Sequence, residues 1–449
     1  MDDFEEPLWR ELCEWRDTGG GPDFPYEAVI RHLRAVGKHF LAPRILEALA
    51  ECRGVLSAQT PQTSGAPGAT GATGSATTLA RFLDVVLDKF DDRYDYPSYT
   101  ALPLLRRFGA QAPGDWEALR RRRDRTVLLL LADLIGFERR VLDGRPADPQ
   151  GMLPTPLLLN KRLRLAARVM EPAALRVLDG AVDPVSVATT PGRTPAGELA
   201  DAVLATATEE ERLVLLASVQ PVYVLHDEYL FLRVLQAFEA TFTFMSATLD
   251  AAVGVLRGER PAEAAVLIAS VADVLRESLP LFSLLATMQP ESFQVFRQYT
   301  DGASAIQSEG YKTFESYCST PARARLDSPA FTSVPGVRDE VLAGRETVQG
   351  TWEDVISIGW LSEPDAAAVR AAARQLEAVH QRWKQTHYRL AVRMIGHRTG
   401  TGSTEGVPYL ASVIRNRLFP AMEAAPDTAP ENVPAADLEP ALEQQSAAG

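Results

Sequence analysis

The chain has 449 residues, a length that suits one large domain or two domains of ordinary size. Its 46% hydrophobic and 23% charged residues are typical of a globular protein with a normal core. The formal net charge of -13 argues against a nucleic acid or an acidic membrane surface as the main partner.

The two ends of the chain and its cysteines indicate the compartment. Cys13, Cys52 and Cys318 are widely separated and odd in number, which suits a reducing compartment and supports no disulfide framework. The acidic N-terminus lacks the apolar region of a signal peptide. The longest purely apolar stretch, near Val127–Ala132, is far too short to cross a membrane. We therefore expect a cytoplasmic protein with no membrane partner.

The first half of the chain predicts helices separated by one linker. Apolar residues recur every three or four positions through residues 1–54, which predicts an N-terminal helical segment. Residues 55–78 are rich in Gly, Ala, Thr and Pro, and we expect a disordered linker there. Helical periodicity returns in four further segments, at residues 79–91, 116–143, 155–179 and 196–218.

The second half is also helical up to a polar tail. The longest helical pattern runs from about residue 222 to 256, and others cover 262–279, stopped by Pro280, and 290–300. The last long helix begins near Ser362, which can cap it, and ends at Gly396. Residues from about 424 to 449 look like a disordered tail. Because strand-like alternation is scarce, the sequence predicts an all-α protein.

Two histidines of the last helix are candidate ligands. His380 and His387 are seven residues apart, so they share one face of that helix. The sequence contains no His-Glu-x-x-His motif and no paired Cys-His cluster, which leaves a multi-ligand zinc site with little support. A haem iron needs only one axial histidine from the protein, because the porphyrin supplies four ligands. The spacing alone does not decide between the two residues.

Three other charged groups have a structural and a functional interpretation. Local physics favours an acidic first turn stabilised by the helix dipole for His226-Asp227-Glu228, with a fixed polar corner of a pocket as the alternative. Arg297 is either a surface ion-pair partner, which the local sequence favours, or a fork that holds a carboxylate. The basic run Arg120–Arg123 reads as a solvated helix start rather than a nucleic-acid site.

Several motifs together resemble one known family. They are His226-Asp227-Glu228 followed by Phe231, the run from Leu284 to Pro290, Phe296-Arg297 with Gln307-Ser308, and a closing block from His387 to Gly396 with Gly400-Thr401-Gly402. In their order and much of their spacing they are similar to tryptophan 2,3-dioxygenase, of the haem-dependent aromatic oxygenase superfamily. The resemblance covers roughly residues 222–420, with a weaker match at Tyr96 to Tyr99.

The resemblance implies a fold, a cofactor and a role for each matching residue. It implies a helical bundle that binds haem b, with His387 as the axial ligand of the iron. It makes Arg297 the group that grips the substrate carboxylate. Around the substrate ring and its amino-acid end it places Phe231, Phe293, Thr401, Tyr96 and Tyr99.

The chain departs from the family in its pocket and in its length. The resemblance places the catalytic positions at Phe231 and Leu235. At Leu235 it expects a distal histidine near the indole N–H, which this chain lacks. The lid segment contains Glu405, an additional carboxylate. Residues 116–220 look like an inserted helical subdomain between residues 79–115 and the haem- and substrate-binding domain at 221–423. The resemblance implies a homo-oligomer, although the insertion could supply the contacts of a neighbouring subunit.

These features predict an oxygenase and leave two alternatives. The main hypothesis is a haem-dependent 2,3-dioxygenase-like enzyme that inserts oxygen from O2 into tryptophan or a modified indole or aromatic amino acid, in secondary metabolism. One alternative is a haem enzyme that hydroxylates an aromatic amino acid with peroxide. The other is a helical haem-binding protein without catalytic activity.

Overall fold

The computed structural model describes residues 5–59, 73–106, 115–178, 194–396, 398, 400 and 406–422. Within these ranges the chain is helical, with one isolated β-bridge between Gly151 and Leu225 and no strand. The all-α prediction is therefore confirmed. In the same ranges, no helix is both long enough and apolar enough to cross a membrane.

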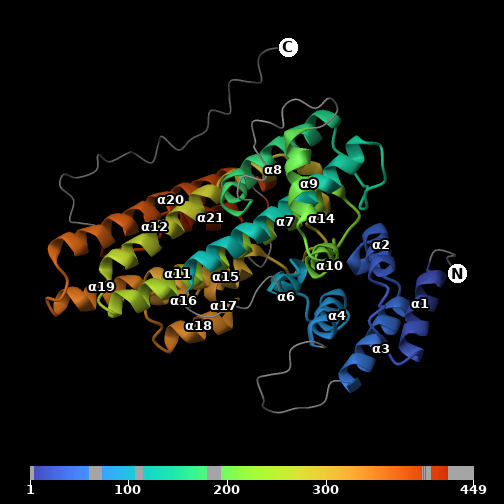
Figure 1. Cartoon of the computed structure of the whole chain (residues 1–449), viewed down its shortest axis with the longest axis horizontal. Helices are drawn as coiled ribbons and strands as arrows, with labels where there is room; N and C mark the ends of the chain where they lie inside the picture. The colour runs from blue at the N-terminus through green and yellow to red at the C-terminus, as the bar shows by residue number, and fades with distance from the viewer. Residues whose placement is uncertain are drawn as a thin grey trace.

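A bundle of long helices forms the main body (Figure 1). Its central member is α11 (His226–Arg257), which is buried on nearly every side and whose apolar residues accordingly extend around the helix. Around α11 lie four helices: α7 (Trp116–Leu142), α12 (Pro261–Ser278), α15 (Glu309–Cys318) and α19 (Val348–Ser357). The final long helix, α20 (Glu363–Ile395), lies along α12. As predicted, the Ser362 side chain caps α20, accepting a hydrogen bond from the backbone N–H of Asp365.

The region predicted as an insertion contributes four helices to this body: α7, α8 (Pro156–Val177), α9 (Pro195–Ala205) and α10 (Glu209–Ala217). The single helix predicted for residues 196–218 is in fact two. Thr208 starts the second one through a capping box with Glu211, and such a cap ends continuous helix because its backbone is extended.

An N-terminal group of helices forms a second, smaller core. It contains α1 (Glu6–Asp17), α2 (Tyr26–Val36), the 3₁₀ turn η1 (Lys38–Phe40), α3 (Pro43–Gln59) and α4 (Thr73–Val86). The expected linker at 55–78 is wrong at both ends, since α3 and α4 extend into it, and residues 60–72 lie outside the described ranges. The predicted tail at 424–449 also lies outside them.

Two short helices connect the N-terminal core to the bundle. They are α5 (Tyr96–Tyr99) and α6 (Leu102–Leu105). Tyr99 belongs to the main core, whereas Ala101 and Leu104 belong to the N-terminal core. The position of α5 therefore depends on both cores.

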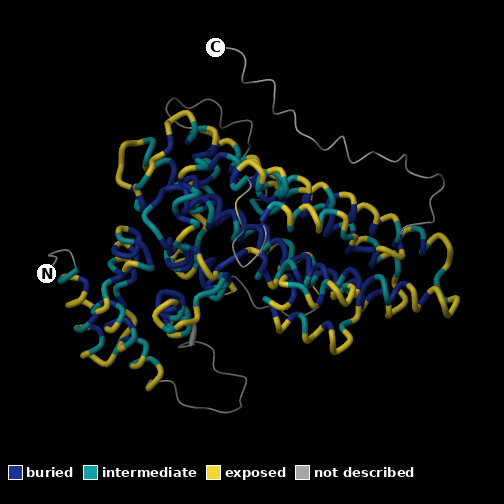
Figure 2. The backbone as a smooth tube through the Cα atoms, turned by 180° about the vertical axis from the view of Figure 1, so that it is seen from behind, coloured by how far each residue is buried: buried dark blue, intermediate teal, exposed yellow. Residues whose placement is uncertain are grey.

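Short helices connect the long ones, and most of them begin at a proline, which suits the first turn because its N–H needs no helical partner. They are α13 (Pro280–Leu285), α14 (Pro290–Phe296), η4 (Ala305–Gln307), α16 (Arg323–Leu326), α17 (Pro329–Thr332), α18 (Pro335–Leu342) and α21 (Val407–Val413). Figure 2 shows buried residues continuing through the centre of the bundle beneath its exposed outer surface.

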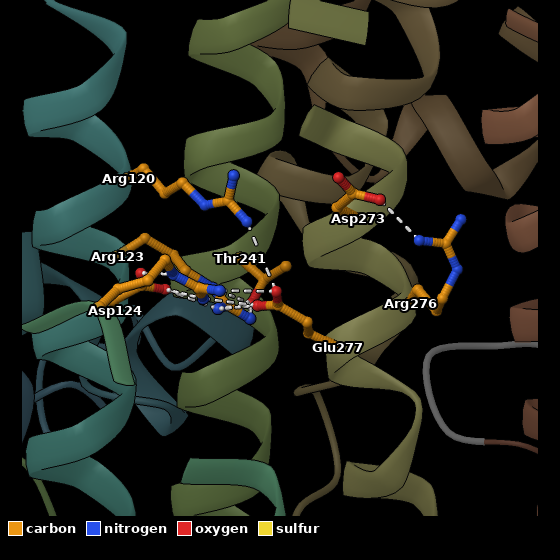
Figure 3. Close-up of polar contacts among 8 residues, drawn as sticks. Arg120, Arg123, Asp124, Thr241, Asp273, Arg276 and Glu277 are labelled. Atoms are coloured by element: carbon orange, nitrogen blue, oxygen red, sulfur yellow. Dashed lines mark hydrogen bonds and ion pairs between the residues drawn. The ribbon is translucent and has the colours of Figure 1, made fainter. Parts of the chain in front are cut away.

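A buried ion network fastens α7 and α8 to α11 and α12 (Figure 3). Asp124 is fully buried and accepts hydrogen bonds from Arg123 at 2.9 Å and from Arg176 of α8 at 2.6 and 3.0 Å. Glu277 of α12 accepts from Arg176 at 2.7 Å and Arg123 at 3.3 Å. The prediction that Arg120–Arg123 is a solvated helix start is therefore wrong for Arg123, which is 4% exposed.

Candidate functional site

A cavity of about 310 Å³ lies among α5, α11, α13, α14, α15, α20 and α21. This size falls within the range of small-molecule and cofactor sites. Of the residues proposed from the sequence, those that line it are Tyr96, Tyr99, Phe231, Leu235, Phe293, Arg297 and His387. Thr401 and Glu405 lie outside the described residues.

His387 presents an available imidazole to this cavity. Its ring stacks on Phe282 with centroids 5.7 Å apart and lies 5.4 Å from the ring of Trp383. The imidazole makes no hydrogen bond with any residue in the described part of the chain. Burial lowers the pKa of His387 to about 4, so the ring is neutral near pH 7 and keeps a lone pair for a ligand.

His380 is in a different situation although it lines the same cavity. It is 2% exposed, and its Nε2 lies 2.8 Å from the hydroxyl of Tyr311. Burial lowers its pKa well below the ordinary value. Because Nε2 is already engaged by Tyr311, the geometry favours His387 over His380 as the ligand of an added group.

These residues fit a haem that is held by one histidine. His387 offers a neutral nitrogen inside a cavity lined mostly by aromatic and aliphatic side chains, as an axial ligand of haem requires. Across the described ranges, no group of three or more His, Cys, Asp or Glu side chains is arranged to hold a metal ion directly.

The α11 and α14 sides of the cavity form an aromatic wall. The ring of Phe231 lies 5.6 Å from Phe293 and 5.5 Å from Phe296. Leu235 follows Phe231 by one helical turn and lines the same cavity. At this point the wall carries an aliphatic side chain, which can neither accept a hydrogen bond nor take a proton.

Arg297 follows α14 and also lines the cavity. Its guanidinium lies 6.0 Å from the centre of the Phe293 ring. Burial, together with the nearby charge of Arg398, lowers the pKa of Arg297. The residue is half-buried at the cavity wall. Its role as the group that holds a carboxylate stays a prediction.

Tyr96 and Tyr99 are positioned by the short helix α5. A capping box between Asp95 and Ser98 starts this helix. The Tyr96 hydroxyl donates to Glu239 at 3.0 Å, and the Tyr99 hydroxyl donates to Glu228 at 3.3 Å. Both tyrosines therefore line the cavity, and they belong to the same chain as α11.

The His226-Asp227-Glu228 motif is the acidic first turn of α11, as expected, and it is also a buried polar corner. His226 Nε2 lies 2.9 Å from Glu138, and Asp227 accepts from Arg162 at 2.6 Å. Glu228 accepts from the backbone N–H groups of Val222 at 2.7 Å and Tyr223 at 3.1 Å. This corner fixes the start of α11, one turn before Phe231.

The sequence interpretation missed several charged residues of the cavity, among them Glu239 and Lys312. Burial raises the pKa of Glu239 to about 7, although hydrogen bonds from Ser308 and Tyr96 oppose the shift. Glu239 follows Leu235 by four residues, so its place on the cavity face of α11 was a readable signal. Lys312 gave no such signal, since a lysine on a short amphipathic helix normally faces water.

No protein-family model matches the chain. Among curated proteins, it is 28% identical over 230 residues to a tryptophan 2,3-dioxygenase of Burkholderia mallei, covering 43% of this chain and 74% of that protein. It is 27% identical over 240 residues to the tryptophan 2,3-dioxygenase of Polaromonas naphthalenivorans, covering 46% and 85%. It is 27% identical over 243 residues to that of Erythrobacter litoralis, covering 46% and 91%.

Proposed function

Because this chain is a member of the tryptophan 2,3-dioxygenase superfamily, we propose that it is a haem-dependent oxygenase that inserts oxygen from O2 into tryptophan or a modified indole or aromatic amino acid. The observation that carries the proposal is the neutral imidazole of His387, open to an aromatic cavity that Arg297 also lines. The departures of this pocket from its relatives lead us to place the reaction in secondary metabolism.

In this proposal His387 holds the haem, and the haem supplies the O2 chemistry when bound. Phe282 and Trp383 fix the plane of the His387 ring through their contacts at 5.7 and 5.4 Å. The low pKa of His387 keeps the imidazole unprotonated throughout the neutral range. The chain therefore contributes a rigid nitrogen ligand that protons do not compete for near pH 7.

The other cavity residues bind and orient the substrate. The Arg297 guanidinium binds the substrate carboxylate through charge-assisted hydrogen bonds. Phe231 and Phe293 form the wall against which the flat ring packs, and Tyr96 and Tyr99 close the cavity from α5. By resemblance to the family we assign Thr401, which lies outside the described residues, to the amino-acid end of the substrate. This positioning is the main contribution of the protein to the reaction.

Leu235 restricts which substrates and products are possible. A side chain that can neither accept a hydrogen bond nor take a proton provides no general base at the ring nitrogen, and such a base is typically worth about 10²–10⁴-fold in rate. We therefore propose a substrate whose ring nitrogen needs no deprotonation, such as an indole altered at nitrogen or carbon.

The presence of Leu235, which provides no general base, also favours a second candidate, a haem enzyme that hydroxylates an aromatic amino acid with peroxide. Product formed under ¹⁸O2 distinguishes the two proposals. Two labelled oxygen atoms in the product support dioxygenation, whereas an unlabelled hydroxyl formed with H2O2 supports the hydroxylase.

The first test is haem reconstitution of the full chain. We expect a strong Soret band that is lost or shifted in His387→Ala and retained in His380→Ala, because Nε2 of His380 is already engaged by Tyr311. Incubation with reductant, O2 and a panel of indoles and aromatic amino acids then identifies the product. A chain that binds no haem, or one whose spectrum is unaffected by His387→Ala, would contradict the proposal.

A further inference from the structure

One part of the cavity wall, where α15, α16 and α20 meet, carries three cations, and two of them have protein partners. Arg325 donates to Glu315 at 2.6 Å through one nitrogen and through a second, shorter contact. Lys384 donates to the backbone carbonyls of Val413, at 3.3 Å, and Asn416. The third cation is Lys312 of α15.

Lys312 is 4% exposed and lines the cavity, yet its ammonium has neither a hydrogen bond nor an ion pair with any residue in the described ranges. The Nζ atom of Lys312 lies over the face of the Tyr311 ring, 4.8 Å from the ring centre. The two carboxylates that act on it are Glu239 and Glu315, which are already engaged by Tyr96 and Arg325 respectively. A buried charge without an acceptor is costly, so this position suits an anionic ligand.

A series of ring contacts connects Lys312 to the proposed haem ligand. Tyr311, beneath the ammonium, stacks on Trp383 with centroids 5.5 Å apart and planes 21° apart. Trp383 in turn lies 5.4 Å from His387. The unpaired ammonium and the available imidazole therefore belong to one continuous wall of the same cavity.

We propose that Lys312 binds a carboxylate of the molecule that occupies this cavity. The proposal rests on the proposed function only for the identity of that molecule, which is either haem, through a propionate, or the substrate, through its own carboxylate. A carboxylate supplies the oxygen acceptors that the ammonium lacks, and a charge-assisted hydrogen bond forms away from water.

The first measurement uses the haem-free chain. Lys312→Met keeps a long side chain but removes the buried charge, so Tm should rise by about 1–3 °C. Lys312→Arg retains the charge and serves as the second variant. Lys161→Met, at an exposed position of α8, is the matched control and should leave Tm unchanged. A lower Tm in Lys312→Met would mean that protein groups already satisfy the ammonium, and would overturn the proposal.

The second measurement identifies the source of the carboxylate. Haem b and its dimethyl ester, which lacks free carboxylates, are titrated by the Soret band. L-Tryptophan and tryptamine, which lacks the carboxylate, are titrated into the same chain by calorimetry. Loss of one charge-assisted bond should weaken the carboxylate-bearing ligand about 10- to 100-fold in Lys312→Met. The ester or the amine should bind equally to the wild type and the variant.

Each outcome has one meaning. Selective loss of haem affinity assigns Lys312 to a propionate, and selective loss of tryptophan affinity assigns it to the substrate. Equal affinities of the wild type and Lys312→Met for all four ligands, or equal losses with and without the carboxylate, overturn the proposal. A wild-type chain with no Soret band contradicts the proposed function instead, and the amino-acid titration alone then decides the role of Lys312.

Discussion

At the scale of single residues, the proposal that the cavity binds an amino acid can be tested at Arg297. Its guanidinium lies at the cavity wall beside Phe293, where burial lowers its pKa and strengthens its interaction with an anion. We predict that Arg297→Ala weakens substrate binding by roughly 1.5–3 kcal/mol, because charge-assisted hydrogen bonds are lost. The Soret band of the variant should stay unchanged, since Arg297 does not contact His387. Spectral titration of the haem-loaded protein measures both quantities.

The control for Arg297 is chemical as well as mutational. Arg297→Lys keeps the charge but loses the planar fork, so an intermediate affinity is expected. An amine that lacks the substrate carboxylate should bind equally to the wild type and to Arg297→Ala. If the variant loses the amine and the amino acid equally, or loses neither, Arg297 does not hold the carboxylate.

The residues that could be predicted are those whose type is unusual at their position. Histidines on an apolar stripe pointed to a buried site, and the family resemblance then selected His387, Phe231 and Phe293, all of which line the cavity. Glu239 and Lys312 were missed because charged residues on helices are solvated by default. Their burial depends on how α11 and α15 approach each other, which neither helix specifies in its own sequence.

At the scale of helices, the ion network of Figure 3 couples the predicted insertion to the bundle. Asp124 is the only carboxylate of α7 drawn there, and it faces two arginines, Arg123 and Arg176. We predict that Asp124→Asn lowers the free energy of unfolding by about 3–5 kcal/mol, because two largely buried cations then share one carboxylate. Urea-induced unfolding followed by circular dichroism measures the loss.

The same figure provides a control on the neighbouring helix. Asp273 and Arg276 form an exposed ion pair at 2.6 Å on α12. Because solvent screens such pairs, Asp273→Asn should change the free energy of unfolding by less than about 0.5 kcal/mol. Similar losses in the two variants would mean that burial does not distinguish the two networks.

Helix boundaries were predictable where the chain carries its own stop signals. Ser362 and Gly396 bound α20, and Pro280 separates α12 from α13, as expected from their local chemistry. The break between α9 and α10 was missed, since apolar periodicity continues across the threonines that end one helix and cap the next. The linker at residues 55–78 was predicted from composition alone, although both ends of this range are helical.

At the scale of the whole molecule, the site is assembled from two cores within one chain. The α5 tyrosines reach the cavity because α5 lies where the two cores meet. Tyr99 belongs to the main core, and Ala101, just after α5, belongs to the N-terminal core. Tyr96 and Tyr99 donate to carboxyl groups of α11, Glu239 and Glu228, which lie about three turns apart on that helix. The contacts between α5 and α11 therefore involve two carboxyl groups, Glu228 and Glu239, that lie in the interior of the protein.

Those two carboxyl groups give the stability of the protein a defined pH dependence. Burial raises the pKa of Glu228 to about 8 and that of Glu239 to about 7, from an ordinary value of 4.5. Between pH 4.5 and these values the folded chain holds protons that the unfolded chain releases, so stability falls as pH rises. The buried histidines act in the opposite sense, because the pKa of His387 is lowered to about 4 from 6.5, and their effect levels off about one pH unit above 6.5.

From pH 6.5 to 8 the two glutamates should lower the free energy of unfolding by on the order of 2 kcal/mol. Lys312 and Lys384, whose pKa values burial lowers to about 8, oppose this change near the upper end of the range. A variant of one glutamate therefore isolates the contribution of that carboxyl group. Glu239→Gln keeps an acceptor for Tyr96 but cannot ionise, so the variant should exceed the wild type by about 1–3 kcal/mol at pH 8 and match it near pH 5. Glu14→Gln, at an exposed position of α1, should follow the wild type at every pH. Parallel curves for Glu239→Gln and the wild type between pH 5 and 8 would show that Glu239 is ionised throughout, and that its buried site binds the carboxylate rather than the acid.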